Sequence, residues 1–338
     1  MTGLLQADAV QLPVADDSVD LVVTSPPYFA LRSYQDDGEH YDGQIGSEAT
    51  PAEFLDALWA VTAECVRVLK PSGSLWVNLG DKYAGSYGGG GASSKSTLGG
   101  GKRRMREAGG GGADCGPTRQ KSLMGLPWRY AIGCIDDLSL ILRAEVVWSK
   151  PNGLPESVKD RVRRSHEQWF HFTLEPRYFS ALDEIREPYD PQSIARADHP
   201  FNGNAFRGRH LDEAIKGGHD GGDGWQPSAL GKVPGSVWSI PTEPLQVPDD
   251  LGVDHFAAFP QEWPRRLILG WCPPDGVVLD PFAGTGTVPM VARALGRTGI
   301  GVDLSSDYLR LARWRVFESG HASKTVARTN GERQGLLL

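Results

Sequence analysis

The sequence lacks the features of membrane, secreted and cysteine-built proteins. No apolar run approaches the roughly 20 residues that a membrane span requires, and the N-terminus has neither the basic start nor the long apolar stretch of a signal peptide. The four cysteines stand far apart without a CxxC pair, which excludes a cysteine-built zinc site and argues against a disulfide scaffold. We therefore expect a reduced, cytoplasmic protein with no membrane partner.

The chain also lacks an excess of basic residues. Its 338 residues include 35 Lys and Arg against 42 Asp and Glu, a formal net charge of −7, which argues against holding nucleic acid through net charge alone. Residues 102–121 are an exception, because six basic and two acidic side chains give this stretch a local charge of +4. The 40% hydrophobic and 23% charged residues are typical of a globular protein with a sizeable core.

Strands and helices alternate along most of the chain. Short apolar runs predict strands at residues 20–24, 74–79, 143–148, 168–173, 276–280 and 298–303. A capping box at residues 50–53, with proline at the first helical position, predicts a helix whose apolar residues continue to Leu69. Further helices are expected up to about Leu295 and around 308–316. This alternation predicts an α/β fold with a mostly parallel sheet covered by helices on both faces.

Two segments interrupt this pattern. Glycine makes up 13 of the 32 residues from 85 to 116, so we expect a mobile surface loop, either a tolerated linker or a flap that closes on a polyanion. Residues 187–249 are rich in Gly, Asp, His and Pro with little periodicity, which predicts a loop-dominated module. The irregular spacing of its histidines and aspartates does not predict a metal site.

Residues 280–287 (DPFAGTGT) form a glycine-rich turn between a predicted strand and a predicted helix. Glycines there let the backbone approach a ligand beside the positive end of the helix. Asp303 ends the next strand, where its carboxylate can accept hydrogen bonds from ribose hydroxyls. A dinucleotide is disfavoured because Pro289 replaces the third glycine of GxGxxG and Asp280 would repel a pyrophosphate. An acid at this place suits a cofactor with a positive amino group.

Residues 25–28 (SPPY) turn the chain sharply at the end of another predicted strand. Pro26 and Pro27 fix φ and leave carbonyl acceptors in a stiff turn. The Ser25 hydroxyl and a carbonyl can both accept hydrogen bonds from one exocyclic amino group, and Tyr28 can stack on a base taken out of the duplex. An ordinary proline turn beside a core tyrosine would look the same, but the glycine-rich turn strengthens the functional interpretation.

Residues 24–28 (TSPPY), followed much later by the turn at 280–287, resemble the DNA amino-methyltransferases, which methylate N4 of cytosine or N6 of adenine. The order of the two motifs resembles the beta class of that family. Further similar stretches are residues 78–81, 150–156, 164–170 and 255–260. The resemblance implies a Rossmann-like fold with a seven-stranded, mostly parallel sheet, a circularly permuted motif order and an irregular inserted module.

The resemblance also implies a cofactor, partners and site residues. S-adenosyl-L-methionine would be the methyl donor and double-stranded DNA the partner, with a cognate restriction endonuclease sharing the site as a further partner to consider. The catalytic residues would be Ser25, Pro26, Pro27 and Tyr28. The cofactor-binding residues would be Asp8, Phe256, Pro260, Asp280, Phe282, Ala283, Gly284, Thr285, Gly286, Thr287 and Asp303. No cysteine lies in the catalytic motif, which argues against C5-cytosine chemistry, since that chemistry needs a thiolate.

The resemblance also divides the chain into functional segments. The expected order is a catalytic half at 1–84, a flexible basic glycine-rich loop at 85–118, the rest of the catalytic half at 119–186, a target-recognition module at 187–249, a cofactor-binding half at 250–320 and a tail at 321–338.

Several functional alternatives stay open. Serine at the first motif position is more frequent among cytosine-N4 enzymes, so we expect cytosine N4 methylation, with adenine N6 as the alternative. Methylation of RNA or of a protein amide would use the same two motifs, and a binding protein without catalysis would retain them. A nicotinamide-dependent oxidoreductase ranks last because the third glycine is missing. The sequence predicts neither the recognition site nor the oligomeric state.

Overall fold

The computed structural model describes the chain at residues 2–30, 35–36, 39–40, 44–85, 118–153, 155–192, 194, 228–245, 247–248, 251 and 258–320. Outside these residues lie 86–117, which hold nearly all of the glycine-rich basic loop, together with most of the module at 187–249, Phe256 and the tail. The expectations for those segments stay predictions. No helix in the described ranges is long and apolar enough to cross a membrane.

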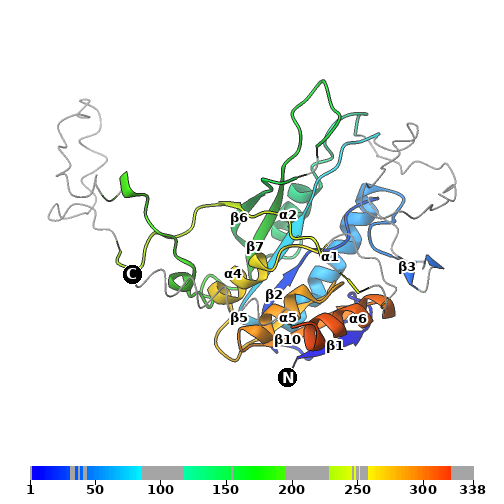
Figure 1. Ribbon diagram of the computed structural model, residues 1–338. Coiled ribbons are helices and arrows are strands. Elements are labelled where there is room, and N and C mark those ends of the chain that lie inside the picture. The colour runs from blue at the N-terminus through cyan, green and yellow to red at the C-terminus, as the bar shows by residue number, and fades with distance from the viewer. Residues whose placement is uncertain are drawn as a thin grey trace.

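Within the described residues, eight strands form one mixed sheet (Figure 1). The order across the sheet is β1 (Gly3–Gln6), β10 (Thr298–Asp303), β9 (Val277–Asp280), β2 (Val19–Thr24), β5 (Leu69–Leu79), β7 (His166–Thr173), β6 (Ile141–Ser149) and β8 (Val237–Ser239). Neighbours from β1 to β5 pair in parallel, β7 is antiparallel to both β5 and β6, and β8 is parallel to β6. A separate antiparallel pair joins β3 (Gln35–Asp36) and β4 (Glu39–His40).

The predicted Rossmann-like, mostly parallel sheet is confirmed, but the described chain has eight strands in it where seven were expected. The additional strand in the irregular module is β8, which spans only three residues. Its Trp238 ring stacks on Trp263 at a centroid distance of 4.8 Å, and Trp263 stacks in turn on Trp169 at 4.7 Å. This stacking anchors β8 against the sheet. Long-range packing therefore creates a strand near the end of the module.

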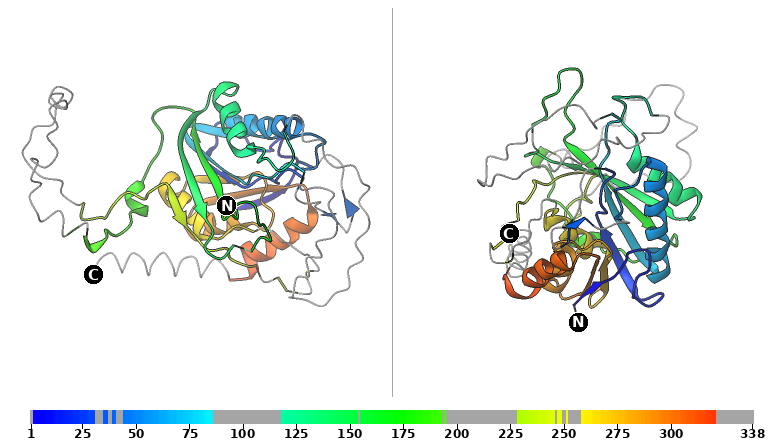
Figure 2. Two further views of the ribbon diagram at one scale, coloured as in Figure 1. Left: turned by 90° about the horizontal axis from the view of Figure 1, so that it is seen from above. Right: turned by 90° about the vertical axis from the view of Figure 1, so that its right-hand side faces the viewer.

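Helices cover both faces of the sheet (Figures 1 and 2). One face carries α1 (Pro51–Val68) and α2 (Leu126–Asp136), over a core of largely aliphatic side chains. The other carries α4 (Glu262–Trp271), α5 (Thr287–Ala294) and α6 (Ser306–Arg313), and the core beneath these helices is rich in tryptophan. A 3-10 turn, η1 (Leu182–Ile185), packs near α4, and a π-helical turn, η3 (Trp314–Glu318), continues α6.

Helix α1 starts at a capping box, whereas α2 has a proline in its first turn but no side-chain cap of its own. The predicted capping box is confirmed: the Glu53 amide donates to Thr50 Oγ1 at 3.2 Å and the Thr50 amide donates to Glu53 Oε2 at 3.0 Å. Helix α2 has no such cap, and the amides of Gly125 and Leu126 donate instead to the Asp81 carboxylate, at 3.1 and 3.2 Å. The start of α2 therefore depends on a residue that is distant in sequence.

Strands β2 and β9 are neighbours at the centre of the sheet, and the chain leaves them in opposite directions. From β9 it passes through α5 to β10, and from β2 it passes through α1 to β5 on the other side. Open α/β sheets bind ligands in the crevice outside the carboxyl ends of such a strand pair. The SPPY motif follows β2 and the glycine-rich turn follows β9, so the fold places both motifs at this crevice.

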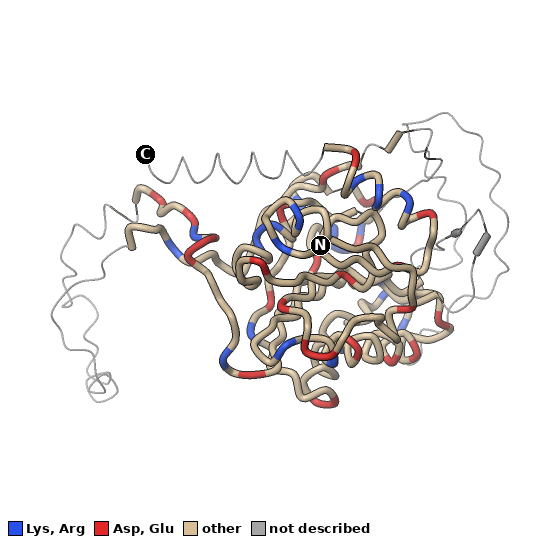
Figure 3. Tube along the Cα trace, turned by 90° about the horizontal axis from the view of Figure 1, so that it is seen from below, with Lys and Arg blue, Asp and Glu red and all other residues tan. Residues whose placement is uncertain are grey.

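The described flanks of the module, residues 187–192 and 228–235, project away from the sheet (Figures 1 and 2). At their base Glu187 and Lys232 exchange two backbone hydrogen bonds, of 2.9 and 2.8 Å. Figure 3 shows acidic and basic residues interspersed along the described chain, including these flanks. The negative net charge is therefore not gathered in one block on the face in view.

Candidate active site

A cavity of about 660 Å³ opens at the ends of β2 and β9. Its volume lies within the range of about 300–1,000 Å³ that is usual for small-molecule and cofactor sites. The predicted site residues that line this cavity are Asp8, Ser25, Pro26, Pro27, Tyr28, Phe282, Ala283, Gly284, Thr285, Thr287 and Asp303. Residues from both ends of the chain and from both predicted motifs thus meet in one place.

Asp280, Gly286 and Pro260 are absent from the lining of this cavity. The buried Asp280 joins the ends of the two central strands, because its Oδ1 accepts hydrogen bonds from Thr24 Oγ1 at 2.8 Å and from the Phe282 amide at 3.1 Å. Burial raises the pKa of Asp280 to about 7, although both hydrogen bonds favour the ionised form. A positive group nearby would favour its carboxylate form.

Gly286 and Pro260 support the cavity wall from behind. Gly286 precedes α5 with a φ of 72°, and a Cβ atom there would lie 2.9 Å from the Cβ of Ala312, so glycine is required both by conformation and by space. Pro260 is buried, and its carbonyl accepts a hydrogen bond from the Trp263 amide at the start of α4, at 3.2 Å. Phe256, the remaining predicted cofactor residue, lies outside the described part of the chain.

Asn78 at the end of β5 holds residues 25–28, the predicted catalytic turn. Its Oδ1 accepts hydrogen bonds from Ser25 Oγ at 3.2 Å and from the Tyr28 hydroxyl at 2.7 Å. Its Nδ2 donates to the carbonyl of Gln168 at 3.1 Å, which fixes the amide so that the oxygen faces the turn. Gly80 leaves room for this arrangement, because a Cβ atom there would lie 2.6 Å from the Tyr28 ring.

Glu167 and Lys150 extend this network along the cavity wall. The Tyr28 hydroxyl lies 2.9 Å from Glu167 Oε2, and the other oxygen of Glu167 pairs with the Lys150 ammonium. Lys150 also stands over the Trp148 ring, with its Nζ 4.1 Å from the ring centroid. The Tyr28 hydroxyl has one hydrogen, but two acceptors, Asn78 Oδ1 and Glu167 Oε2, lie within its reach. It can donate to only one of them at a time, so this wall has acceptor capacity for a donor such as an amino group.

Only part of this network was predictable from the sequence. Asn78, Lys150 and Glu167 lie in stretches that resemble the amino-methyltransferases, but no catalytic or binding role was predicted for Asn78 or Lys150. For Glu167 the sequence left two roles open, contact with the target base or the DNA backbone and a structural hydrogen bond at a helix start or in the core. Asn78 is 1% exposed in a strand that is otherwise apolar at its end, and such a buried polar residue is a signal that could have identified it. Lys150 and Glu167 lie at the facing ends of the antiparallel strands β6 and β7, a pairing that only the sheet reveals.

The glycine-rich turn is fixed mainly through backbone groups. The Ala283 amide donates to the carbonyl of Val302 at 2.9 Å, and the Gly284 amide donates to Asp303 Oδ2 at 2.8 Å. Asp303 Oδ1 accepts a further hydrogen bond from the Ser305 amide at 2.9 Å. A carboxylate oxygen accepts more than one hydrogen bond, so Asp303 can also accept from hydroxyl groups of a ligand in the cavity.

A buried arginine from η3 holds the far side of the same turn. Arg315 Nη1 donates to Thr285 Oγ1 at 2.7 Å and to Thr287 Oγ1 at 2.6 Å. Burial lowers the pKa of Arg315 to about 10, so the guanidinium stays charged at neutral pH. Arg315 was not among the site residues predicted from the sequence. Its position on the apolar face of the last helix is the signal that could have identified it.

Residues 242–245, which follow β8, close another side of the cavity. Asn152 and Thr242 exchange two hydrogen bonds: Asn152 Nδ2 donates to the Thr242 carbonyl at 3.2 Å, and the Thr242 amide donates to Asn152 Oδ1 at 2.8 Å. Glu243 lines the cavity and accepts hydrogen bonds at 3.1 Å from the backbone amide and the side-chain amide of Gln261. The end of the module is therefore fastened directly to the site.

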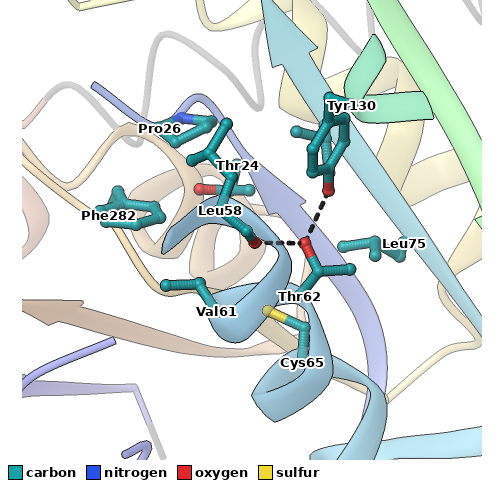
Figure 4. Close-up of a pocket in the computed structure, with 10 residues that line it drawn as sticks. Thr24, Pro26, Leu58, Val61, Thr62, Cys65, Leu75, Tyr130 and Phe282 are labelled. Atoms are coloured by element: carbon teal, nitrogen blue, oxygen red, sulfur yellow. Dashed lines mark hydrogen bonds between the residues drawn. The ribbon is translucent and has the colours of Figure 1, made fainter. Parts of the chain in front are cut away.

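A second, much smaller void of about 10 Å³ lies under the catalytic turn (Figure 4). Pro26 and Phe282 line both this void and the large cavity, so they form the partition between the two. Below the partition Thr62 Oγ1 donates to the Leu58 carbonyl at 2.8 Å and lies 2.7 Å from the Tyr130 hydroxyl. With room for about one water-sized sphere, this floor is nearly fully packed and supports the catalytic turn from below.

The residues of the cavity fit S-adenosyl-L-methionine. Asp303 and Asp8 offer acceptors to a nucleoside, Phe282 offers an aromatic surface, and the hydroxyls of Thr285 and Thr287 adjoin a buried cation that suits a carboxylate. The acceptor-rich wall at Ser25 and Tyr28 adjoins this set in the same cavity. Among the residues that the structure describes, no cluster of side chains could hold a metal ion.

The sequence of the chain is similar to that of known DNA methylases. The family model for DNA methylases, N6_N4_Mtase, matches residues 19–313. The chain is 35% identical over 316 residues to the Type II methyltransferase M.XycI of Xanthomonas campestris pv. cyanopsidis, over 93% of this chain and 87% of that protein.

Two solved structures share the fold. PvuII DNA methyltransferase (cytosine-N4-specific) superposes with a TM-score of 0.62 at 18% identity, over 98% of this chain and 93% of that one. A DNA modification methylase from Thermus thermophilus, solved with S-adenosyl-L-methionine, superposes with a TM-score of 0.52 at 22% identity, over 96% and 95%. From its motifs, its fold and the match over most of its length, this chain belongs to the N6_N4_Mtase family of DNA methylases, which transfer a methyl group from S-adenosyl-L-methionine to an amino group of a base.

Proposed function

We propose that this protein methylates N4 of cytosine at a specific site in double-stranded DNA. The observation that carries the proposal is the position of Ser25 and Pro26 in the cavity wall, beside Tyr28 and next to the glycine-rich turn that would hold the cofactor. Serine as the first residue of the motif supports cytosine over adenine. PvuII DNA methyltransferase, which is cytosine-N4-specific and shares the fold, supports the same choice.

The residues of the catalytic turn account for the chemistry. An exocyclic amino nitrogen is a poor nucleophile because its lone pair is delocalised into the ring. The Ser25 hydroxyl and the Pro26 carbonyl would accept its two hydrogens and favour a pyramidal nitrogen, while Tyr28 would stack on the flipped base. When bound, the cofactor supplies a methyl group on a positively charged sulfur. The turn thus contributes positioning and electrostatics, and no covalent enzyme intermediate is needed.

Other parts of the chain would supply DNA recognition. The stretch at 187–249 would read the sequence, since its described flanks project from the sheet and the residues after its last strand are hydrogen-bonded to Asn152 in the cavity wall. A partner restriction endonuclease would cleave the same site when it is unmethylated. DNA modified by this protein would then resist that endonuclease.

The test is to express the protein in a bacterial host that lacks DNA methylation, digest the host DNA to nucleosides and identify methylated products by mass spectrometry. N4-methylcytosine is the expected product. N6-methyladenine would overturn the choice of base and leave the cofactor and the mechanism in place. If purified protein binds S-adenosyl-L-methionine but methylates no DNA base, then RNA and protein amides become the substrates to examine.

A matched pair of serine variants locates the chemistry. Ser25→Ala should lower the methylation rate by at least about 100-fold, because a misplaced reacting group costs about that much. Ser18→Ala is the control, since the Ser18 hydroxyl donates to the carbonyl of Ala15 and lies outside the cavity. Equal activity in the two variants would contradict the role of Ser25.

A further inference from the structure

Arg315 is a buried cation directly behind the glycine-rich turn. Its side chain is 3% exposed, and its Nη1 donates to Thr285 and Thr287, both of which line the cavity. Across the described residues, its Nε is buried without a hydrogen-bond partner, and Glu243 acts on its guanidinium through its electrostatic field. Since burying a charge without a hydrogen-bonded counter-ion is costly, an arginine at this place needs a reason beyond packing.

The hydroxyl groups of Thr285 and Thr287 can carry the effect of the Arg315 charge into the cavity. Both hydroxyl oxygens accept from Arg315, so the hydrogen of each hydroxyl must point elsewhere. The two oxygens lie 3.3 Å apart, which lets one hydroxyl donate to the other. The remaining hydroxyl hydrogen is then available to an acceptor in the cavity. A guanidinium that donates to this hydroxyl pair makes it a stronger donor.

The surrounding backbone favours the same kind of ligand. Thr287 is the first residue of α5, where amides of the first turn have no carbonyl partner within the helix and the helix dipole is positive. Asp303 and Asp8 place negative charge at other points of the cavity. An anionic group of a ligand would therefore be attracted to the threonine pair and repelled by these carboxylates.

We propose that Arg315 is a positioning residue that supplies the counter-charge for the α-carboxylate of S-adenosyl-L-methionine, acting through Thr285 and Thr287. Because one end of the site is positive and the other negative, the cofactor binds in one orientation only. Glu243, the acid whose field acts on Arg315, also lines the cavity and is suited to the α-ammonium group beside that carboxylate. The buried guanidinium thus favours the zwitterionic amino-acid end of the cofactor through the two threonines, without contacting it directly.

The test compares two ligands and two arginine variants by isothermal titration calorimetry, without DNA. The ligands are S-adenosyl-L-methionine and the same molecule lacking its carboxylate. Arg315→Met removes the charge at similar volume. Arg293→Met is the matched control, because Arg293 joins the same helical segments by donating to the carbonyl of Val316 at 2.6 Å but does not contact a residue that lines the cavity.

The natural protein should prefer the intact cofactor by roughly 10- to 100-fold, the range of a hydrogen bond to a charged group. Arg315→Met should reduce this preference to about threefold or less, and Arg315→Lys should restore part of it. Arg293→Met should keep the full preference even if it lowers the melting temperature. An undiminished preference in Arg315→Met would overturn the proposal.

Variants at the threonines keep the test decisive if Arg315→Met fails to fold. Thr285→Val and Thr287→Val preserve side-chain shape and remove the hydroxyls through which Arg315 would act. Combined, they should lower the preference for the carboxylate to the same level. A preference that persists in the folded double variant would equally overturn the proposal. Because no DNA is present, these outcomes do not depend on which base the protein methylates.

Discussion

The two turns that meet in the cavity are held in different ways. The catalytic turn at 25–28 is held by polar side chains from the ends of three other strands, namely Asn78, Lys150 and Glu167, two of which are only partly buried. The turn at 280–287 is held by backbone amides on Asp303 and by the buried Arg315. Changes around the first turn should therefore affect turnover with little effect on cofactor binding. Changes around the second should affect binding first.

Among the residues that hold the two turns, the largest expected effect is at Asn78, which contacts both Ser25 and Tyr28. Asn78→Leu should lower kcat by about 100-fold, because the turn loses the acceptor that orients both hydroxyls. The cofactor affinity should change less than about twofold. Asn78→Asp retains an oxygen at Oδ1 and serves as the conservative comparison. Methyl transfer at saturating cofactor, measured alongside calorimetric affinity, separates the two quantities.

The next largest effect is expected at Asp303, which holds the glycine-rich turn at 280–287. In the natural protein both carboxylate oxygens of Asp303 accept a hydrogen bond from a backbone amide. Asp303→Asn keeps one oxygen but replaces the other by an NH2 group, which is a donor, so one of these hydrogen bonds is lost. We expect the Kd for the cofactor to rise about 30-fold, in line with the loss of a charge-assisted hydrogen bond. kcat at saturating cofactor should fall much less. A variant whose kcat fell while its Kd stayed constant would contradict the division between the two turns.

A smaller effect is expected at Glu167, which acts on the catalytic turn through Tyr28. Glu167→Gln keeps the shape of the side chain but removes its charge, so the pair with Lys150 is lost. The expected result is a fall in kcat of about tenfold with unchanged cofactor affinity. Glu145→Gln on the neighbouring strand β6 is the control, because Glu145 does not line the cavity.

The last prediction concerns the pH dependence of stability and not turnover or binding, and it rests on Asp280, which joins the ends of β2 and β9. Burial raises its folded-state pKa to about 7, so between about pH 4 and 7 the folded chain keeps a proton that the unfolded chain releases. The free energy of unfolding should therefore fall as the pH rises through this window, by at most about 1.4 kcal/mol per pH unit. Denaturation of the natural protein and of Asp280→Asn at several pH values isolates this contribution. An identical slope in both proteins would show that Asp280 does not titrate in this way.

The parts of the fold that were predictable depend on short-range signals. The capping box fixed the start of α1, and the two motifs marked the ends of β2 and β9, because their residues lie close together in sequence. Helix α2 and strand β8 were not predicted, because α2 starts on Asp81 and β8 is anchored by the stacking of Trp238 on Trp263. Tertiary contacts decide these elements and leave little local pattern.

The same distinction applies to the site. Eleven predicted residues line the cavity because the resemblance concerned the motifs themselves. Asp280 was predicted as a ligand of the cofactor, but its Oδ1 is engaged by Thr24 and Phe282 in the interior. The supporting residues, Glu167 and Arg315 above all, come from elements whose position only the folded sheet and the last helix determine.

The reciprocal backbone bonds between Glu187 and Lys232 have a consequence for the history of the protein. These bonds hold residues 187 and 232 side by side and so form a neck at the base of the segment 188–231. This segment can be lengthened, shortened or exchanged while the two residues that flank it keep their positions. The strand β8 and the clasp of Asn152 with Thr242 lie beyond that neck and stay in place. If target recognition resides in this segment as proposed, descendants of one ancestor can acquire new DNA specificities by exchanging a cassette while their chemistry is inherited unchanged.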